Sequence, residues 1–430
     1  MAEPRTAAGE NDLADDRRRD EPLEGRQDGP LAGVRVLELG QLIAGPFAAR
    51  LLGEFGADVI KVEPPAREAS EGGDPLRKWR KLYPDDPSGT SLWWAVQARN
   101  KRSITLDLKR PEGQQLVRDL AARADIVVEN FRPGALEKWG LGYEALSANN
   151  PGLILVRLSG YGQTGPYRDR PGFGAIAESM GGMRYVTGFP DRPPVRMNLS
   201  IGDSLAALHA VIGALVALHH RRQTGAGQVV DVALYEAVFN MMESTLPEFD
   251  RYGIVRERTG TNLTGIVPSN TYPTADGAHI VIGGNGDSIF KRLMKAIGRD
   301  DLADDPSLAN NAGRALRAAE LDEAISAWTS TQTLDDALEA MAGAQVPSGK
   351  IYSAADMVND PQYAARGMIE RGALADGTSI AIPGVVPKLS RTPGGTRWLG
   401  PALGAHTAQV LEELGLSPEQ VEALRVKRVI

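Results

Sequence analysis

The chain has 430 residues, more than one hydrophobic core normally supports, so we expect two structural units. The net charge is -7 and charges of both signs are dispersed along the main body of the chain, so nothing in this distribution argues for a nucleic-acid or membrane surface. Cysteine is absent, which excludes disulfides, thiolate metal sites and a cysteine nucleophile, and none of the 5 histidines stands at metal-site spacing beside carboxylates. We therefore expect a cytoplasmic metabolic protein without a metal.

The first segment, residues 1–30, mixes acidic and basic residues and lacks an apolar stretch of the length that a secretory signal requires. Its acidic content also argues against a transit peptide. We predict a disordered tail. No window of the chain approaches the roughly 18 uninterrupted apolar residues of a membrane span, so membrane insertion is not expected.

Short β-rich runs alternate with helical segments from residue 31 onward. The pattern predicts strands at Val34–Leu39, Val59–Val62, Ser103–Leu106, Ile126–Val128 and Leu153–Leu158, with helices at Pro46–Phe55 and Pro111–Ala122. Continuous apolar strands separated by helices indicate a mostly parallel sheet covered on both faces. The predicted fold class is α/β, with a Rossmann-like large domain. The first strand-to-helix turn does not spell Gly-x-Gly-x-x-Gly, which disfavours a dinucleotide dehydrogenase.

A long apolar helix is predicted at Leu205–Arg222, and Asp203 stands immediately before it. Free backbone N–H groups and the helix dipole favour a carboxylate over a carboxylic acid at this position. An acidic residue before an apolar helix is most often an ordinary cap, so the spacing alone does not assign chemistry to Asp203.

A smaller α+β unit is predicted to follow, beginning with a linker helix. Its expected elements are helix Tyr235–Ser244, strands within 266–274 and 278–283, and helices Ser288–Ile297, Arg314–Thr329 and Leu334–Ala342. The polar, glycine-bearing stretch from Arg258 to Gly265 suits a mobile loop. The last segment contains a β-rich patch at Thr378–Pro383 and a final helix at Thr407–Leu414.

Several short segments, in this order, carry a family resemblance. They are Ala44–Pro46, Asn100–Ile104, Val128–Gly134, Ser159–Pro166, Arg170–Phe173, Gly202–Ser204 and Thr224–Gln228. Together they closely resemble the class III CoA-transferases, the family that includes formyl-CoA transferase, carnitine CoA-transferase and alpha-methylacyl-CoA racemase. The resemblance runs from about Leu31 to the carboxyl terminus.

The resemblance implies an organisation that periodicity does not reveal. The large CoA-binding domain would be discontinuous, with residues 31–225 as its first part and residues 346–430 as a return segment. The linker helix and small domain, residues 226–345, would be inserted between them. Two chains of such proteins pass through one another like links, so an interlocked homodimer is expected.

The resemblance also implies that Asp203 is the catalytic nucleophile. Its carboxylate would open an acyl-CoA thioester and carry CoA onward through mixed anhydrides and an aspartyl-CoA thioester. A carboxylate needs no partner base for this step, since its reference pKa of about 4 leaves it ionised at neutral pH. Coenzyme A would enter and leave as an acyl-CoA substrate, and no permanently bound cofactor is expected.

Four positions match the family's CoA-binding residues: Leu106, Asn130, Lys138 and, beside the catalytic end, Ala44. Lys138 replaces an arginine of formyl-CoA transferase, which keeps a cation for a phosphate but loses the bidentate fork. The loop bounded by Gly260 and Gly265 matches in position a glycine-bearing loop that covers the site in that enzyme. A lid and a plain surface loop remain equally compatible with its sequence.

Three positions bear on which reaction and which acceptor of the family this chain would use. Phe173 stands where the racemase branch needs a proton-transferring histidine, which favours a transferase over an epimerase. Ile43 replaces a glutamine that handles the small acceptor in formyl-CoA transferase, which argues against oxalate. Arg184 interrupts a small and apolar run and is a candidate to bind the distal carboxylate of a diacid.

The sequence of residues 170–178 and 201–209 most resembles that of transferases that move CoA from succinyl-CoA to malate, citramalate or related diacids of four or five carbons. Two alternatives stay open. An alpha-methylacyl-CoA racemase or epimerase would exchange an alpha proton with deuterated water, and a non-catalytic CoA-binding paralogue would form no covalent intermediate at Asp203.

Overall fold

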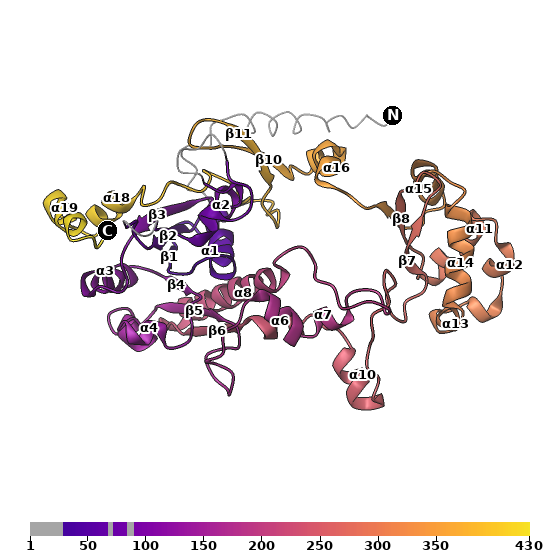
Figure 1. Cartoon of the computed structure of the whole chain (residues 1–430), viewed down its shortest axis with the longest axis horizontal. Helices are drawn as coiled ribbons and strands as arrows, with labels where there is room; N and C mark the ends of the chain where they lie inside the picture. Colours follow the sequence, from indigo (N-terminus) through magenta and orange to yellow (C-terminus); the bar gives the residue numbers. More distant parts are fainter. Residues whose placement is uncertain (1–28, 68–71, 84–89) are drawn as a thin grey trace, which may run out of the picture. The chain divides into compact units, whose positions relative to one another are not determined.

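A computed structural model describes residues 29–67, 72–83 and 90–430 (Figure 1). The predicted disordered tail, residues 1–30, lies outside the described residues except for its last two positions. The chain forms two compact units. Unit 1 comprises the chain up to Phe173, Gly202–Leu234 and Gly367–Ile430, and unit 2 comprises Gly174–Ile201 and Tyr235–Arg366. These divisions fall at other residues than the predicted ranges 31–225, 226–345 and 346–430.

Unit 1 is built on a six-stranded sheet with the order β3-β2-β1-β4-β5-β6. Every neighbouring pair in this sheet is parallel. The strands are β1 Arg35–Glu38, β2 Asp58–Glu63, β3 Lys101–Thr105, β4 Ile126–Glu129, β5 Ile154–Ser159 and β6 Val229–Ala233. The strand order changes direction between β1 and β4, as in doubly wound nucleotide-binding sheets. The predicted α/β, Rossmann-like class is confirmed.

Helices connect these strands, as a parallel sheet requires. They are α1 Ala44–Glu54, the 3-10 helix η2 Pro75–Lys78, α2 Leu92–Gln97, α3 Pro111–Ala121, α4 Ala135–Lys138, α5 Tyr143–Ser147 and α8 Ile201–Thr224. Helix α3 begins with a proline at its first position, where the missing N–H would have had no partner in the helix.

The carboxyl-terminal segment completes the core of unit 1. An antiparallel hairpin, β10 Ile369–Ala373 and β11 Ser379–Pro383, is followed by α18 Thr407–Glu413 and α19 Pro418–Val426. Val410, Leu411 and Val421 pack in one buried cluster with Leu37 of β1 and Ile104 of β3. Figure 1 shows these two helices in yellow near β3.

The prediction that the helix at residues 407–414 is the last one was wrong, because α19 follows it. Ser417 caps this helix through a capping box with Gln420, and Pro418 occupies its first turn. These three residues are a start signal that sequence analysis passed over.

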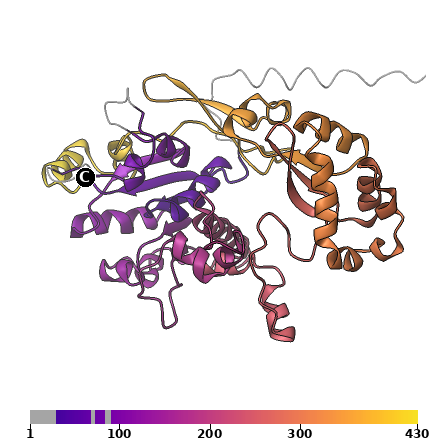
Figure 2. The same cartoon turned by 45° about the vertical axis from the view of Figure 1, so that its right-hand side comes forward.

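Unit 2 has a three-stranded antiparallel sheet of its own, with the order β7-β8-β9. Helices surround this sheet, and the orange part of Figure 2 shows them together. Its core joins Tyr272 and Ile280 of the strands to Leu293, Leu321 and Met341 of the helices. The strands are β7 Ser269–Pro273, β8 His279–Gly283 and β9 Ser348–Lys350, and the helical elements that follow β8 are α11 Asp287–Ala296, α12 Asp300–Ala303, η3 Pro306–Leu308, α13 Asn311–Leu316, α14 Ala318–Thr329 and α15 Leu334–Gly343.

The predicted helix at residues 314–329 is in fact two helices, because the chain leaves helical geometry at Arg317, between α13 and α14.

The remaining helices of unit 2 flank this core in sequence. They are α6 Gly174–Met180, α7 Met183–Val186, α10 Thr245–Tyr252, α16 Ala354–Asn359 and α17 Pro361–Ala365. Helix α9, Leu234–Phe239, has its first residue in unit 1 and the rest in unit 2.

Helix α8 is the one helix of the described residues that is long and apolar enough to cross a membrane by length and composition. Core helices of soluble proteins pass the same test. A row of small residues, Ala206, Ala210, Ala214 and Ala217, is buried inside unit 1. A side chain at Gly213 would also come within 2.5 Å of Val230 on β6, so this face of the helix packs closely on the sheet.

Candidate active site

The carboxyl edge of the parallel sheet brings several predicted site residues together. Ligands of doubly wound sheets bind at this edge, at the point where the strand order reverses. Here that point lies between β1 and β4, and Asn130 follows β4 directly. Asn130 Oδ1 accepts from the Gln41 amide at 2.8 Å, and its Nδ2 donates to the Gln41 carbonyl at 2.8 Å. Asn130 therefore fixes the chain between β1 and α1.

A cavity of about 120 Å³ opens at the same edge. Leu106, one of the predicted CoA-binding residues, lines it where β3 ends. Phe131 and Trp139 form another part of the wall, with ring centroids 5.2 Å apart in an edge-to-face arrangement. The complete lining is Leu39, Gln41, Val62, Glu63, Pro64, Leu106, Asp107, Leu108, Lys109, Phe131 and Trp139. The cavity combines apolar and aromatic walls with a few polar groups, as small-molecule sites do.

Charged side chains stand around this cavity. Lys109 lines it, and Arg67 forms an ion pair with Asp107 at its wall. Lys138, a predicted CoA-binding residue, is the exposed last residue of α4, immediately before the cavity-lining Trp139. Cations in these positions are suited to phosphate groups.

Helix α1 begins at Ala44, next to the bonded Gln41–Asn130 pair. Ile43 is the residue before the helix and offers no side-chain cap, and Pro46 in the first turn has no N–H. Ala44 itself is buried. The backbone amides at the start of this helix are therefore directed to the carboxyl edge of the sheet without a capping side chain.

Asp203 lies in the first turn of α8, because this helix begins at Ile201 rather than at the predicted Leu205. Its side chain is partly exposed, while the neighbouring Gly202 is buried. The helix N-terminus favours the ionised form of a carboxyl group at this place. The first turn of a helix that packs firmly on the sheet thus presents a partly accessible carboxylate.

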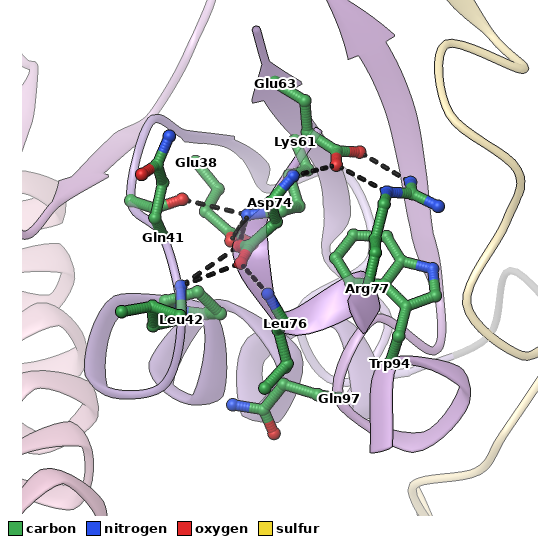
Figure 3. A network of polar contacts seen from close by, with 12 residues as sticks. Glu38, Gln41, Leu42, Lys61, Glu63, Asp74, Leu76, Arg77, Trp94 and Gln97 are labelled. Atoms are coloured by element: carbon green, nitrogen blue, oxygen red, sulfur yellow. Dashed lines mark hydrogen bonds and ion pairs between the residues drawn. The ribbon is translucent and has the colours of Figure 1, made fainter. Parts of the chain in front are cut away.

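A buried charge cluster lies beneath the β1–α1 connection, and sequence analysis missed it. Lys61 Nζ lies 2.8 Å from Glu38 Oε1 and 2.9 Å from Asp74 Oδ2, and all three side chains are almost completely buried (Figure 3). Lys101 Nζ pairs with Glu38 Oε2 at 2.7 Å, and Glu63 holds Arg77 at 2.8 Å through both of its oxygens.

The protonation states follow from these neighbours. Burial lowers the pKa of Lys61, but the carboxylates of Asp74, Glu38 and Glu63 outweigh burial and raise it above the ordinary lysine value. Burial raises the pKa of Asp74, but Lys61 and backbone amides lower it overall. Burial, together with the positive charge of Lys61, lowers the pKa of Lys101 to about 8 although Glu38 opposes this shift.

Arg184 belongs to unit 2, on the short helix α7. Its Nη2 donates to Glu178 Oε2 at 2.9 Å, and Arg196 Nε lies 3.2 Å from the same oxygen. Glu178 is buried, whereas the side chains of Arg184 and Arg196 are 28% and 44% exposed. One carboxylate thus serves two guanidinium groups, which leaves this group of residues with a net positive charge.

Gly260 and Gly265 also belong to unit 2 and lie in the connection between α10 and β7. Both adopt left-handed backbone conformations, with φ of 71° and 74°, which favour glycine. A side chain at Gly260 would approach the Phe189 ring to 2.9 Å. The backbone conformation alone explains why glycine occupies these two positions. The prediction that the loop acts as a lid stays a prediction.

Unit 1 brings Ala44, Leu106 and Asn130 to one sheet edge, with Lys138 nearby in the chain and Asp203 on α8 of the same unit. Arg184, Gly260 and Gly265 lie in unit 2. Within residues 29–67, 72–83 and 90–430, no group of three or more histidine, aspartate and glutamate side chains could hold a metal ion.

Comparisons with known proteins match nearly the whole chain. A family model described as CoA-transferase family III matches residues 31–407. The chain is 54% identical over 403 residues to succinyl-CoA–D-citramalate CoA-transferase of Chloroflexus aurantiacus, covering 93% of this chain and 98% of that protein. It is 44% identical over 405 residues to the succinyl-CoA–L-malate CoA-transferase beta subunit of the same organism, covering 93% and 98%. A solved CAIB/BAIF family protein from Brucella suis has a TM-score of 0.77 and 35% identity, covering 90% of this chain and 100% of that one.

Proposed function

The chain belongs to CoA-transferase family III and is an acyl-CoA:carboxylate CoA-transferase, and we propose that it moves CoA from succinyl-CoA to a dicarboxylic acid of four or five carbons. The observation that carries this substrate class is the 54% identity, over nearly the whole of both chains, to a protein named for succinyl-CoA and D-citramalate. The relative named for L-malate supports the same class of acceptor.

The proposed nucleophile is Asp203. Its carboxylate oxygen attacks the thioester carbonyl of succinyl-CoA, a mixed anhydride forms, and CoA leaves as the thiolate. The thiolate attacks the Asp203 carbonyl carbon, which gives an aspartyl-CoA thioester and releases succinate. The acceptor carboxylate attacks this thioester, and a second anhydride forms as the thiolate leaves again. Attack of the thiolate on the acceptor carbonyl completes the new CoA thioester and restores the Asp203 carboxylate.

The position of Asp203 in the first turn of α8 supports this role. The helix dipole favours the ionised carboxylate, which is the reactive form, so a general base is not required. Each step exchanges one activated acyl group for another, so water must be kept from the intermediates. We propose the loop bounded by Gly260 and Gly265 as the lid that excludes it.

The proposed CoA subsite is the carboxyl edge of the unit 1 sheet. The cavity beside Leu106, Phe131 and Trp139 offers apolar and aromatic walls for the adenine ring, and Lys109 and Lys138 offer charges for phosphates. Ala44 and Asn130 stand where the thioester end would approach. The proposal includes no permanently bound cofactor.

We propose, for each residue separately, that Arg184 of unit 2 binds the distal carboxylate of the acceptor and that Ile43 of unit 1 contacts the acceptor. Arg184 and Arg196 share the buried carboxylate of Glu178, so their joint charge is positive and partly exposed to solvent. A substrate carboxylate would balance that charge through charge-assisted hydrogen bonds. An apolar Ile43 in place of an amide suits the carbon chain of a larger diacid than oxalate.

We further propose a cytoplasmic homodimer. Helix α8 exposes Leu208, Ile212, Leu215 and Val216, each between 41% and 62%, on one chain alone. An apolar surface of this kind on the helix that carries Asp203 is typical of a surface covered by protein. Sedimentation of the purified chain at micromolar concentration is expected to give twice the mass of one chain.

An acceptor panel tests the proposed function. The purified protein is incubated with succinyl-CoA and with citramalate, malate, glutarate, acetate or propionate, and new CoA thioesters are detected by mass. Transfer to the diacids and little transfer to the monocarboxylates is expected, and Asp203→Asn is the matched inactive control. Preferential transfer to acetate or propionate would contradict the proposed acceptor class.

A further inference from the structure

The segment from Gly40 to Pro46, which joins β1 to α1, is held through its backbone by side chains from other elements. Lys61 Nζ donates to the Gly40 carbonyl at 2.8 Å, and Asn130 bonds both the amide and the carbonyl of Gln41. Asp74 accepts from the Leu42 amide, Gln97 donates to the Ile43 carbonyl at 3.1 Å, and Lys101 donates to the Pro46 carbonyl at 2.7 Å. The shape of this segment is therefore set from outside it.

Leu42 is the residue in this segment that most needs a restraint. Its φ is 65°, in the left-handed region that side chains with a Cβ disfavour. The Leu42 amide donates to both carboxylate oxygens of Asp74, each 3.1 Å from its nitrogen. Figure 3 draws these two contacts as dashed lines. Ile43 and Ala44 follow directly, so the direction in which α1 begins depends on how Leu42 is held.

Asp74 is itself fixed by its neighbours. Its Oδ1 caps η2 by accepting from the Leu76 amide at 2.9 Å, and its own amide donates to Glu63 Oε2 at 2.9 Å. Its Oδ2 lies 2.9 Å from Lys61 Nζ. An aspartate held by so many partners cannot turn toward a substrate, and it transmits its position only through the groups that it bonds.

The cluster around Asp74 is electrically balanced. Glu38, Glu63 and Asp74 supply three negative charges, and Lys61, Lys101 and Arg77 supply three positive ones. All six side chains are buried. A neutral cluster of this kind offers no net charge to a ligand, although one of its members, Glu63, also lines the cavity of the proposed CoA subsite.

We propose that Asp74, supported by Lys61, is a positioning residue that holds Leu42 and thereby sets Ile43 and Ala44 against the reacting acyl group. The inference rests on the proposed function for the meaning of Ile43 and Ala44. Asp74 contacts no substrate in this account, so its effect on catalysis passes entirely through the backbone of the segment.

The test compares two serine substitutions. Asp74→Ser keeps a side-chain oxygen that can cap η2 but removes the charge and the reach to Leu42. Glu54→Ser is the matched control, because Glu54 is a buried carboxylate of unit 1 at the far end of α1, and its side chain pairs with Arg50 and Arg99. Both full-length proteins are first shown by thermal melting to be folded at the assay temperature.

Two measurements are then made. Backbone hydrogen exchange of a peptide covering residues 39–47 is expected to accelerate about tenfold or more in Asp74→Ser and to stay unchanged in Glu54→Ser. The kcat for CoA transfer is expected to fall about tenfold to a hundredfold in Asp74→Ser, with KM for succinyl-CoA changed much less, because misplacement acts on the reacting geometry. Glu54→Ser is expected to keep kcat within about twofold of the starting protein.

A folded Asp74→Ser protein with unchanged exchange at residues 39–47, or a Glu54→Ser protein that loses kcat equally, would overturn the inference. If Asp74→Ser does not fold, Gln97→Leu takes its place, since it removes only a neutral donor to the Ile43 carbonyl. It must then accelerate exchange in the same peptide and lower kcat, and a normal kcat would count against the inference. Should the unaltered protein transfer no CoA, the proposed function fails, and the exchange measurement still judges the restraint on the segment.

Discussion

Two groups of charged residues in this protein show opposite designs. In unit 1, Lys61, Asp74 and Glu38 belong to a cluster in which every charge is buried and balanced. In unit 2, Arg184 and Arg196 share one buried carboxylate, Glu178, and remain partly exposed. The first group has no charge left for a ligand, whereas the second keeps a positive charge near solvent.

The difference teaches how buried charge is used in each place. In a balanced buried cluster, the cost of removing each charge from water is offset only by attraction to the other members. Removing one member therefore leaves another buried charge uncompensated. An unbalanced and partly exposed group tolerates such a loss better and can accept a substrate anion. We therefore expect the unit 1 cluster to control stability and backbone geometry, and the unit 2 group to control acceptor choice.

Lys61→Met gives the largest expected effect on this comparison. The substitution leaves Glu38 and Asp74 without their shared cation, and the free energy of unfolding should fall by about 3–5 kcal/mol. Urea denaturation at neutral pH measures this change. The matched change in the other group, Arg196→Met, should lower it by at most about 1 kcal/mol because the side chain is exposed. Similar losses in the two variants would show that the groups do not differ as described.

Arg184→Ala should act on acceptor recognition rather than on folding. Loss of a charge-assisted contact to the distal carboxylate should raise KM for citramalate about tenfold to a hundredfold, since hydrogen bonds to charged groups contribute about 1.5–3 kcal/mol. KM for a monocarboxylate should change little. Steady-state kinetics with both acceptors make the comparison, and equal changes for both would remove Arg184 from the acceptor subsite.

Arg196→Ala should produce the same pattern at a smaller amplitude. Its side chain is more exposed than that of Arg184, so solvent screens its attraction for a carboxylate more strongly. An increase of about threefold in KM for the diacid is expected, measured in the same assay. A larger effect than that of Arg184→Ala would reverse the assigned order of the two arginines.

The pH dependence of stability is the smallest expected effect. Because the pKa of Asp74 is lowered in the folded protein, its charged form adds stability above its unfolded pKa of about 3.9, and this contribution is lost as pH falls through the lower folded value. The difference in unfolding free energy between the protein and Asp74→Asn should thus be constant from pH 5 to 7 and shrink below about pH 4. A difference that grows on acidification would contradict the assigned shift.

Sequence patterns predicted the sheet and the helix that carries Asp203, because both depend on local apolar periodicity. They did not predict the charge cluster. Residues 59–62 were interpreted as a continuously apolar strand although Lys61 stands within it, and its partner Asp74 lies beyond the strand in an irregular segment. Pairing of this kind depends on how the chain returns to the sheet edge, which spacing does not encode. A lysine inside an otherwise apolar strand was nevertheless a usable signal.

The site residues divide in the same way. Ala44, Leu106 and Asn130 follow parallel strands, and the carboxyl ends of parallel strands share one edge, so their common location follows from the predicted topology. The partnership of Arg184 with Glu178 needed the fold, since the two residues stand on separate short helices. Helices α13 and α14 were predicted as a single helix, because no proline or glycine marks the break between them at Arg317.

Covalent trapping at residue 203 tests the central claim most directly. The protein is incubated with succinyl-CoA, quenched with hydroxylamine, digested and examined by peptide mass spectrometry, with Asp203→Asn and the protein without succinyl-CoA as controls. The account predicts a hydroxamate on Asp203 that appears only with succinyl-CoA and is absent from both controls. An unmodified Asp203 in a preparation that is actively transferring CoA would contradict the account.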